Sequence, residues 1–458
     1  MSSEARPSVW RLLAFASPVT LNGLLLYPMV AVLPAIFAKN FDISLQEIGS
    51  LLFLGRMFDA VTDPLIGHLS DKTRSRFGAR KPWVFAAGFL LILPTFLLFS
   101  PPAEIDAVAL GALILLIYLL LTMLFIPHLA WSAEISRDYD QRTRIASFIA
   151  QFSQAGILMF GLVPLLLGTG RGGFTPEVLF VFGVGVAFLA PVVCTLATAL
   201  GPGGPVIPAP RATLAETLGA LRRNRPFHIF AGAYMIGGIG MGMYYSLFYL
   251  YTINFLQLGS IFSWSLLTGS VTTILSIPLW RWAAGRMGKH RAWAAANFAG
   301  AVLFLALAMV SPGEGAFATV LTLLIVHNIA AAGLHFLPGA LLGDVIDYDT
   351  LRNRRNRAGM YFASFLFLTK ANAALGGALG FWILGWLGYD PTKPGPEAST
   401  SLVVLCFVVP ALILMLSSAV MWFFPLHRAR QATIARRLAG RARRVAATLD
   451  EAGPAGHA

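Results

Sequence analysis

Residues 46–81 read QEIGSLLFLGRMFDAVTDPLIGHLSDKTRSRFGARK, and this stretch decides the fold. Its first part, residues 46–69, is an apolar run long enough to cross a hydrocarbon core of ~30 Å as a helix that rises about 1.5 Å per residue. A short loop rich in Lys and Arg follows the run. Such loops are typical of the cytoplasmic side of a membrane. The stretch therefore predicts a membrane-spanning helix that ends at the cytoplasmic face.

The same pattern recurs along the chain of 458 residues, which is 57% hydrophobic and only 12% charged, with a mean hydropathy of +0.71. A soluble domain carries about 25% charged residues, so this composition excludes a soluble protein with a large core. We expect an all-α membrane protein. Its twelve predicted spans are residues 10–37, 46–69, 83–100, 107–132, 145–168, 177–200, 228–256, 260–283, 292–311, 316–342, 360–388 and 401–424.

The distribution of positive charge predicts the orientation. Of the 34 Lys and Arg residues, Lys39, Arg171 and Lys393 lie in loops after odd-numbered spans, and Arg56 and Lys370 lie within spans. The others lie in the N-terminal segment, the loops after even-numbered spans and the C-terminal tail, or within three residues of them at the end of a span, as Arg11 and Arg281 do. By the positive-inside rule both termini are cytoplasmic. The formal net charge of +13 then reflects topology, so we expect no nucleic-acid partner.

The chain divides into two halves of six spans. We expect a six-helix bundle over 1–200, a cytoplasmic loop over 201–226 that begins GPGGP, a second six-helix bundle over 227–426 and a basic cytoplasmic tail over 427–458. The loops 67–81 and 285–291 are both short, basic and glycine-containing, and each follows the second span of its half. Parallel repeats of this kind build the major facilitator fold, which places the substrate between the halves.

The tail contains a basic amphipathic stretch, HRARQATIARRLAGRARR, over residues 427–444. We interpret it as a helix that lies on anionic lipid headgroups, with the binding of a partner as the alternative. Membrane lipid is therefore an expected partner. We expect a monomer, because the fold needs no second copy to bury its polar residues.

Ionisable residues inside spans are the main functional signal. Asp59 and Asp63 are four residues apart and share one face of a helix, and Arg56 lies three residues before Asp59. An Asp at the bilayer centre costs roughly 2.5–3.5 kcal/mol, and two like charges at this spacing repel each other. We expect the pair to bind an alkali cation or a proton, with hydroxyl ligands from Thr62 and Thr122. The alternative is a purely structural ion pair with Arg56.

Lys370, in the eleventh span, is too deep to reach either interface. A buried ammonium needs a carboxylate partner, and the aspartate pair is the expected one; backbone carbonyls or water are the alternative. The polar residues that we expect to contact the substrate are few, and each has satisfied helix–helix contact as its alternative. They are Asn22, His128, Gln151, His335 and Asn372, with Gln154, His327 and Asn328 beside them.

Two long motifs resemble one known family. Residues 55–83 (GRMFDAVTDPLIGHLSDKTRSRFGARKPW) and 341–359 (LLGDVIDYDTLRNRRNRAG) resemble the signatures of the glycoside–pentoside–hexuronide:cation symporters, the melibiose permease family of the major facilitators. Residues 127–144 (PHLAWSAEISRDYDQRTR) resemble a third signature less closely, and the similarity extends over essentially the whole chain.

The resemblance implies a cation site for sodium, lithium or protons at Asp59, Asp63, Thr62 and Thr122. It also implies that Lys370 links this site to the sugar site. The residues that it implies for a cytoplasmic gate, which closes through charge networks, are Asp71, Arg74, Arg80, Asp344, Asp347 and Tyr348.

The sequence departs from the melibiose permeases at their sugar-binding positions. Ser17 and Pro18 stand in place of a Lys-Asp pair, Phe125 and Leu129 in place of an Asp and a Trp, and Ala150 in place of an Arg. Cation coupling is therefore better supported by the residues than any sugar specificity. An apolar cavity suits the amphiphiles that the related animal lysophosphatidylcholine symporters move.

We expect a multi-pass protein of the inner membrane that moves a small solute, a sugar or glycoside, by cation-coupled alternating access. The coupling ion is Na⁺ or H⁺, and we expect no other cofactor. The alternatives are a cation-coupled lysolipid transporter and a membrane sensor that does not transport. We expect no enzyme, because the sequence has no recognisable metal cluster, nucleophile–base arrangement or phosphate-binding loop.

Overall fold

The computed structural model describes residues 7–41, 43–136, 139–167, 173–203, 222–353, 357–392 and 396–451, and in these ranges the regular structure is entirely helical. The elements of the first half are α1 (Val9–Ala16), η1 (Ser17–Val19), η2 (Asn22–Leu26), α2 (Tyr27–Ala31), α3 (Leu33–Asn40), α4 (Leu45–Lys72), α5 (Lys81–Leu90), α6 (Ile92–Phe99), α7 (Ala107–Ile135), α8 (Tyr139–Leu166) and α9 (Pro176–Leu200).

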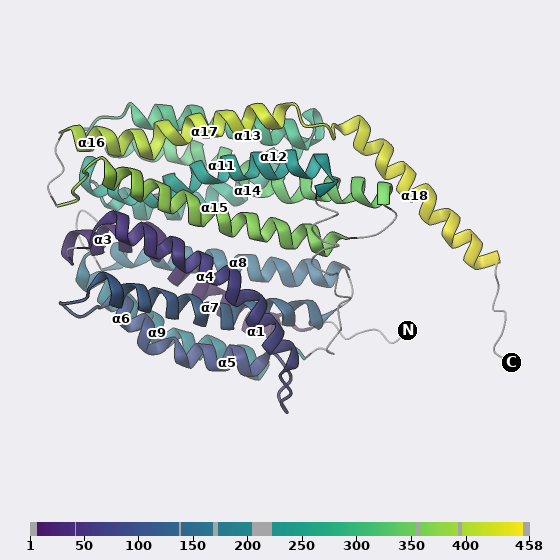
Figure 1. The fold of residues 1–458 in the computed structure, drawn as a ribbon, viewed down its shortest axis with the longest axis horizontal. Coiled ribbons are helices and arrows are strands. Elements are labelled where there is room, and N and C mark those ends of the chain that lie inside the picture. Colours follow the sequence, from purple (N-terminus) through teal and green to yellow (C-terminus); the bar gives the residue numbers. More distant parts are fainter. Residues whose placement is uncertain are drawn as a thin grey trace.

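The second half contains α11 (Arg225–Leu250), η3 (Tyr251–Phe255), α12 (Ser260–Met287), α13 (Lys289–Ala308), α14 (Ala316–Asn353), α15 (Ala358–Trp386), α16 (Pro396–Val403), η4 (Val404–Val408), α17 (Val409–Trp422) and α18 (Arg428–Glu451). The two halves form two bundles that lie side by side (Figure 1). Most of the loop predicted over 201–226, and parts of the motifs 127–144 and 341–359, lie outside the described residues.

Ten helical segments of the described chain are long and apolar enough to cross a membrane. Helices α4 and α11, 28 and 26 residues long, stand at the second and seventh predicted spans and are less apolar. Arg56, Asp59 and Asp63 lower the hydropathy of α4. The all-helical membrane fold is thus confirmed, whereas the count of twelve spans stays a prediction. The loop after α4 and helix α18 lie at the same end of the molecule, opposite α3, α6 and α16 (Figure 1).

The first predicted span is broken into short pieces. Pro18, Pro28 and Pro34 lie within or beside η1, α2 and α3, and each removes a backbone donor that a continuous helix needs. The π-helical turn η2, Asn22–Leu26, follows the first of these breaks. Such turns are frequent at functional sites, and this one turns Asn22 toward the space between the bundles.

Close backbone approach joins α11 to α15 within the second half. A Cβ at Gly242 would lie 2.8 Å from the Gly376 Cα, and one at Gly376 would lie 2.6 Å from the Ile239 carbonyl oxygen. A Cβ at Gly238 would overlap the side chain of Asn372. The glycines of the seventh span therefore serve close packing here.

Helix α18 confirms the predicted basic amphipathic helix of the tail, and its first turns pack on the end of α14. Ile434 is 4% exposed and belongs to the apolar core of the second bundle. Gln431 donates a hydrogen bond of 2.9 Å to Asp347, and Arg441 donates one of 2.7 Å to the Leu351 carbonyl. The tail thus contacts the protein along one side, beyond any contact with lipid.

Candidate functional site

The two aspartates of α4 lie in one cluster with residues of α7 and α15. The Thr122 hydroxyl is 3.1 Å from Asp59 Oδ1 and 3.2 Å from Asp63 Oδ1, so it connects the two carboxylates. The Lys370 ammonium donates a hydrogen bond to Asp63 Oδ2 and lies 3.7 Å from Asp59 Oδ2. The structure therefore brings three predicted residues of the cation site and the predicted lysine together, and Lys370 has a carboxylate partner.

Arg56 adds a second positive charge to this cluster. Its Nη1 atom is 3.5 Å from Asp59 Oδ2, and its guanidinium lies over the Tyr118 ring, 5.0 Å from the centroid. The Arg56 side chain is 13% exposed and that of Asp59 6% exposed. The cluster therefore holds two carboxylates and two cations in a largely buried place, which keeps its net formal charge at zero.

Thr62 contributes differently from the prediction. Its hydroxyl donates to the Asp59 carbonyl at 3.5 Å, so in this conformation it bonds the backbone of α4. Two carboxylates and the Thr122 hydroxyl still offer the oxygen ligands that a hard monovalent cation takes. Groups of three or more His, Cys, Asp or Glu side chains that suit a metal are absent from the part of the chain that the structure describes.

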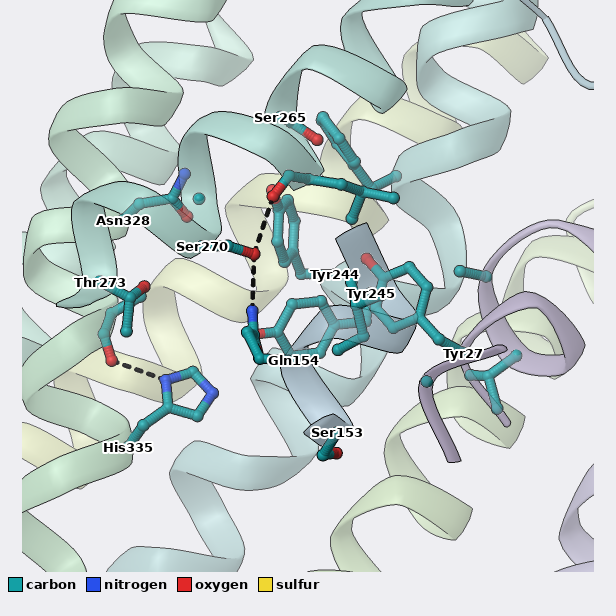
Figure 2. Close-up of a pocket in the computed structure, with 18 of the residues that line it drawn as sticks. Tyr27, Ser153, Gln154, Tyr244, Tyr245, Ser265, Ser270, Thr273, Asn328 and His335 are labelled. Carbon is teal, nitrogen blue, oxygen red and sulfur yellow. Dashed lines mark hydrogen bonds between the residues drawn. The ribbon is translucent and has the colours of Figure 1, made fainter. Parts of the chain in front are cut away.

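A cavity of about 530 Å³ lies between the bundles next to this cluster. Its wall combines aromatic side chains with neutral hydrogen-bonding groups (Figure 2). The labelled residues come from both halves: Tyr27, Ser153, Gln154, Tyr244, Tyr245, Ser265, Ser270, Thr273, Asn328 and His335. The volume falls in the range of ~300–1,000 Å³ that is usual for small-molecule sites.

Hydrogen bonds organise part of this wall. Gln154 donates to the Ser270 hydroxyl at 2.6 Å, and Ser270 donates to the Leu266 carbonyl at 3.0 Å, so α8 and α12 are linked across the cavity (Figure 2). His335 Nδ1 lies 2.7 Å from the Ala331 carbonyl. These bonds involve some of the hydroxyl, amide and imidazole groups of the wall. A hydroxyl-rich solute can form hydrogen bonds with the other polar groups.

The predicted substrate contacts have three different positions. Those that line the cavity, together with Arg56, are Asn22, His327, Asn328 and His335. Gln151 is on the exposed side of α8, and Gln154, one turn later, faces the cavity in its place. The remaining two predicted contacts, His128 and Asn372, are packed elsewhere.

His128 is 2% exposed, its Nε2 atom lies 2.7 Å from the Phe15 carbonyl, and its ring stacks on Phe15. Asn372 donates to the Tyr234 carbonyl at 3.1 Å and packs against Gly238. Both residues hold helices together in this conformation, and neither lines the cavity. Neither residue is therefore part of the proposed site.

Two of the predicted gate residues of the first bundle, Asp71 and Arg80, belong to one network centred on Arg80, which is 8% exposed. Arg80 donates to Glu134 at 3.0 Å, to Ser70 at 2.7 Å and to Asp71 at 2.5 Å. Arg74 is exposed in the segment after α4. These three partners belong to the same bundle as Arg80.

The predicted gate residues of the second bundle also find partners within that bundle or in the tail. Asp344 accepts a hydrogen bond of 2.6 Å from Lys289, and Asp347 accepts one from Gln431 of α18. The Arg430 guanidinium lies 5.8 Å from the centre of the Tyr348 ring. These contacts connect α14 to α13 and α18.

Two hydrogen bonds between the bundles lie in the half of the molecule away from α18. Trp382 of α15 donates to the Ser50 hydroxyl of α4 at 2.9 Å, and the Phe174 amide donates to the Tyr249 hydroxyl at 3.0 Å. The Asp63–Lys370 contact lies between these bonds and the end that bears the Arg80 network. The bundles are thus joined at one end and at mid-depth.

Some residues of the site were not predicted from the sequence. Tyr118 precedes Thr122 by one helical turn, a spacing that could have placed it on the same face. Glu134 lies within the third motif. Its negative charge, near loops that are rich in Lys and Arg, could have indicated a salt bridge. The tyrosines of the cavity gave none, because aromatic residues are also abundant in helix packing.

Comparisons with known proteins agree with this architecture. A family profile described as "MFS/sugar transport protein" matches residues 14–428. The inner membrane symporter YicJ of Escherichia coli is 28% identical, with 88% of each chain covered, and the putative glycoside/cation symporter YagG of the same organism is 27% identical, again with 88% of each chain covered.

A more distant relative is the sodium-dependent lysophosphatidylcholine symporter 1-B of Danio rerio, which is 23% identical, with 83% of this chain and 80% of the relative covered. Among solved structures, a bacterial homologue of the human lysosomal transporter Spinster, in an inward-facing and unoccupied conformation, has a TM-score of 0.66 at 13% identity. The alignment covers 94% of this chain and 98% of that one, and it shows a shared fold.

Proposed function

Because this chain belongs to the MFS/sugar transport protein family, we propose that it is a cation-coupled symporter that moves a sugar or glycoside by alternating access. The resemblance to the glycoside–pentoside–hexuronide:cation symporters is confirmed, as is the prediction of a transporter in place of an enzyme. The chain is a multi-pass membrane protein, which we place in the inner membrane. The coupling ion, Na⁺ or H⁺, and the monomeric state are part of the proposal.

The observation that carries this proposal is the contact of Lys370 on α15 with Asp63 on α4, one turn from Asp59. A cation that binds the two carboxylates must compete with the Lys370 ammonium. Cation binding therefore loosens a contact between the bundles, and the position of the bundles changes the affinity for the cation. This reciprocity is what couples ion and solute in a symporter.

The arrangement of contacts supports an inward-open conformation. The bundles touch through Trp382 and Ser50 at the end away from α18, whereas Arg80 and Asp344, predicted gate residues at the other end, bond within their own bundles. We propose that closing of this end exchanges such pairs for contacts between the bundles. The cavity would then open to the opposite side.

The test replaces Asp59 and Asp63 one at a time with Asn in purified protein reconstituted in liposomes. We expect each variant to lose sodium- or proton-driven uptake of a glycoside panel and to lose thermal stabilisation by sodium. The exposed loop residue Glu104 provides a matched control, since Glu104→Gln also removes one carboxylate. Cation-driven uptake that survives both aspartate changes would show that the ion binds elsewhere. If the natural sequence shows no cation-driven flux at all, the result would favour a sensor that does not transport.

A lysolipid is the second candidate for the transported solute. The similarity to a lysophosphatidylcholine symporter favours it, as do the aliphatic and aromatic side chains of the cavity, such as Leu26, Val30 and Phe248. Thermal stabilisation by a lysolipid series, compared with a series of glycosides, separates the two. Stabilisation by glycosides alone excludes the lysolipid.

A further inference from the structure

We propose that the hydrogen bond between Gln154 and Ser270 is a contact between the bundles that the solute replaces. Gln154 is then a specificity-determining residue, because a hydroxyl group of the solute takes its amide from Ser270. Ser270 is a positioning residue that acts through Gln154. This inference rests on the proposed function, since it concerns the cavity of the symporter. It goes further by naming the contact through which the solute acts on the two bundles.

The position of the bond is the first observation. Gln154 belongs to α8 of the first bundle and Ser270 to α12 of the second, and both residues line the cavity. The Gln154 amide nitrogen is 2.6 Å from the Ser270 hydroxyl oxygen, and Figure 2 shows this bond at the cavity wall. A solute in the cavity therefore contacts the bond directly.

The second observation is that each partner is fixed to its own bundle. Near Gln154, α8 packs closely on the π-helical turn η2, since a Cβ at Gly23 would lie 2.5 Å from the Ile157 amide nitrogen. Ser270 is 3% exposed, and its hydroxyl donates to the Leu266 carbonyl one turn earlier on α12. A movement that separates the bundles here by about 1 Å or more therefore breaks the bond.

The third observation is the place of the bond in the interface between the bundles. The helix pairs α4–α15 and α8–α12 both join the two bundles. The first pair carries the contact of Asp63 with Lys370, for which the cation competes in the proposed function. The second pair carries the bond of Gln154 with Ser270. The cation thus acts on one helix pair and the solute on the other, and a shared effect on the position of the bundles links the two binding sites.

The chemistry of the two side chains allows the solute to replace the bond. The Ser270 hydroxyl donates its one proton to Leu266 and accepts the bond from Gln154 on its oxygen. When Gln154 turns to the solute, Ser270 keeps its donated bond and is not left as an unpaired donor. The Gln154 carboxamide both donates and accepts hydrogen bonds, so it matches a solute hydroxyl, which does the same. The exchange therefore leaves no buried donor without a partner.

Ser270 and the solute consequently compete for Gln154. The apparent affinity for the solute falls with the fraction of molecules in which Gln154 is bonded to Ser270. Removing the Ser270 hydroxyl should strengthen solute binding, whereas removing the Gln154 amide should weaken it. A purely structural bond would not give this result, because the loss of either partner would then act in the same direction.

The experiment uses three probes: methyl β-D-glucoside, methyl α-D-galactoside and methyl β-D-xyloside. Their binding to the purified full-length protein is measured by calorimetry with sodium at pH 6, so that either coupling ion is present. The probe that the natural sequence binds most tightly is then used on the variants. Ser270→Ala should bind it at least about threefold more tightly. Gln154→Met keeps the length of the side chain without the amide and should bind it at least about fivefold more weakly.

A control and a double variant make the test specific. Ser276 lies on the same helix, and its hydroxyl donates to the Thr272 carbonyl as that of Ser270 donates to Leu266, four residues earlier in each case. Ser276 does not line the cavity, and Ser276→Ala should leave the affinity unchanged. In the variant that combines Gln154→Met with Ser270→Ala, the loss of the hydroxyl should add nothing to the effect of Gln154→Met, because Ser270 acts through Gln154.

Equal or weaker binding by Ser270→Ala overturns the inference, as does a gain in affinity that persists in the double variant. Unchanged binding by Gln154→Met, or binding of none of the three probes, overturns it as well. If a glycoside is nevertheless taken up with the cation, the symporter function stands and only the role of the bond fails. If Gln154→Met does not fold, the comparison of Ser270→Ala with Ser276→Ala still decides.

Discussion

The Lys370 ammonium on α15 bonds the Asp63 carboxylate on α4, 307 positions earlier in the chain, and so joins the two bundles at mid-depth. In this arrangement the lysine occupies one of the two carboxylates that we assign to the cation. A first prediction follows from this competition. We expect Lys370→Ala to bind sodium or protons more tightly than the natural sequence, by about tenfold or more, because the cluster then carries net negative charge.

The measurement is a sodium titration followed by tryptophan fluorescence or calorimetry, in the absence of solute. Lys39→Ala, at the exposed end of α3, removes an equal charge away from the cluster and serves as the control. Unchanged or weaker cation binding in Lys370→Ala would contradict the competition. Lys370→Arg keeps the charge and should resemble the natural sequence.

The cluster of Asp59, Asp63 and Lys370 could be predicted from the sequence for two reasons. One is the short spacing of the two aspartates, and the other is the high free-energy cost of an unpaired charge inside a membrane. Asp59 and Asp63 share a helix face by spacing alone, and an ammonium at the depth of Lys370 needs a carboxylate. The helices of the two bundles followed from apolar runs in the same way. Both the apolar helices and the paired charges are required by the lipid that surrounds the chain. Such requirements can be read from the sequence, because they act on residue types and on their spacing.

The wall of the cavity was less predictable because it depends on helix rotation. Gln151 and Gln154 are both polar residues of α8, and only the packing of α8 against α12 shows that Gln154 faces inward. The polar side chain of His128 is equally compatible with a place in the cavity wall, and only the three-dimensional structure shows that it bonds the Phe15 carbonyl instead. The partnership of Arg80 with Glu134 joins residues 54 positions apart, and no local pattern specifies it.

Close packing of α11 on α15 gives a second prediction. A Cβ at Gly376 would lie 2.6 Å from the Ile239 carbonyl oxygen, so Gly376→Ala should force the helices apart at a cost of about 1–3 kcal/mol. At the neighbouring Gly377 the nearest atom is 3.8 Å away, on Val30. Gly377→Ala should be neutral or slightly stabilising, since Ala favours helix. Apparent melting temperatures in detergent compare the two, and equal values would refute the close approach.

The Arg80 network gives a third prediction. Glu134→Ala removes the carboxylate that Arg80 contacts at 3.0 Å, and the side chains of both residues are at most 10% exposed. We expect a loss of about 1–3 kcal/mol in stability, because a buried guanidinium is left with fewer partners. The loss should change little with salt, since buried pairs are weakly screened. Thermal unfolding at low and high ionic strength tests this, with Glu104→Ala as the exposed control.

The docking of α18 gives the last prediction. Ile434 is buried against the second bundle, whereas its neighbour Thr433 is exposed. Ile434→Asp places a charge in an apolar contact and should release α18 from α14, and Thr433→Asp, which adds the same charge on the outer side, should not. Hydrogen–deuterium exchange over residues 428–441 should rise at least about tenfold in Ile434→Asp alone. Equal exchange in the two variants would mean that α18 is held by its hydrogen bonds to Asp347 and Leu351 and not by its apolar side.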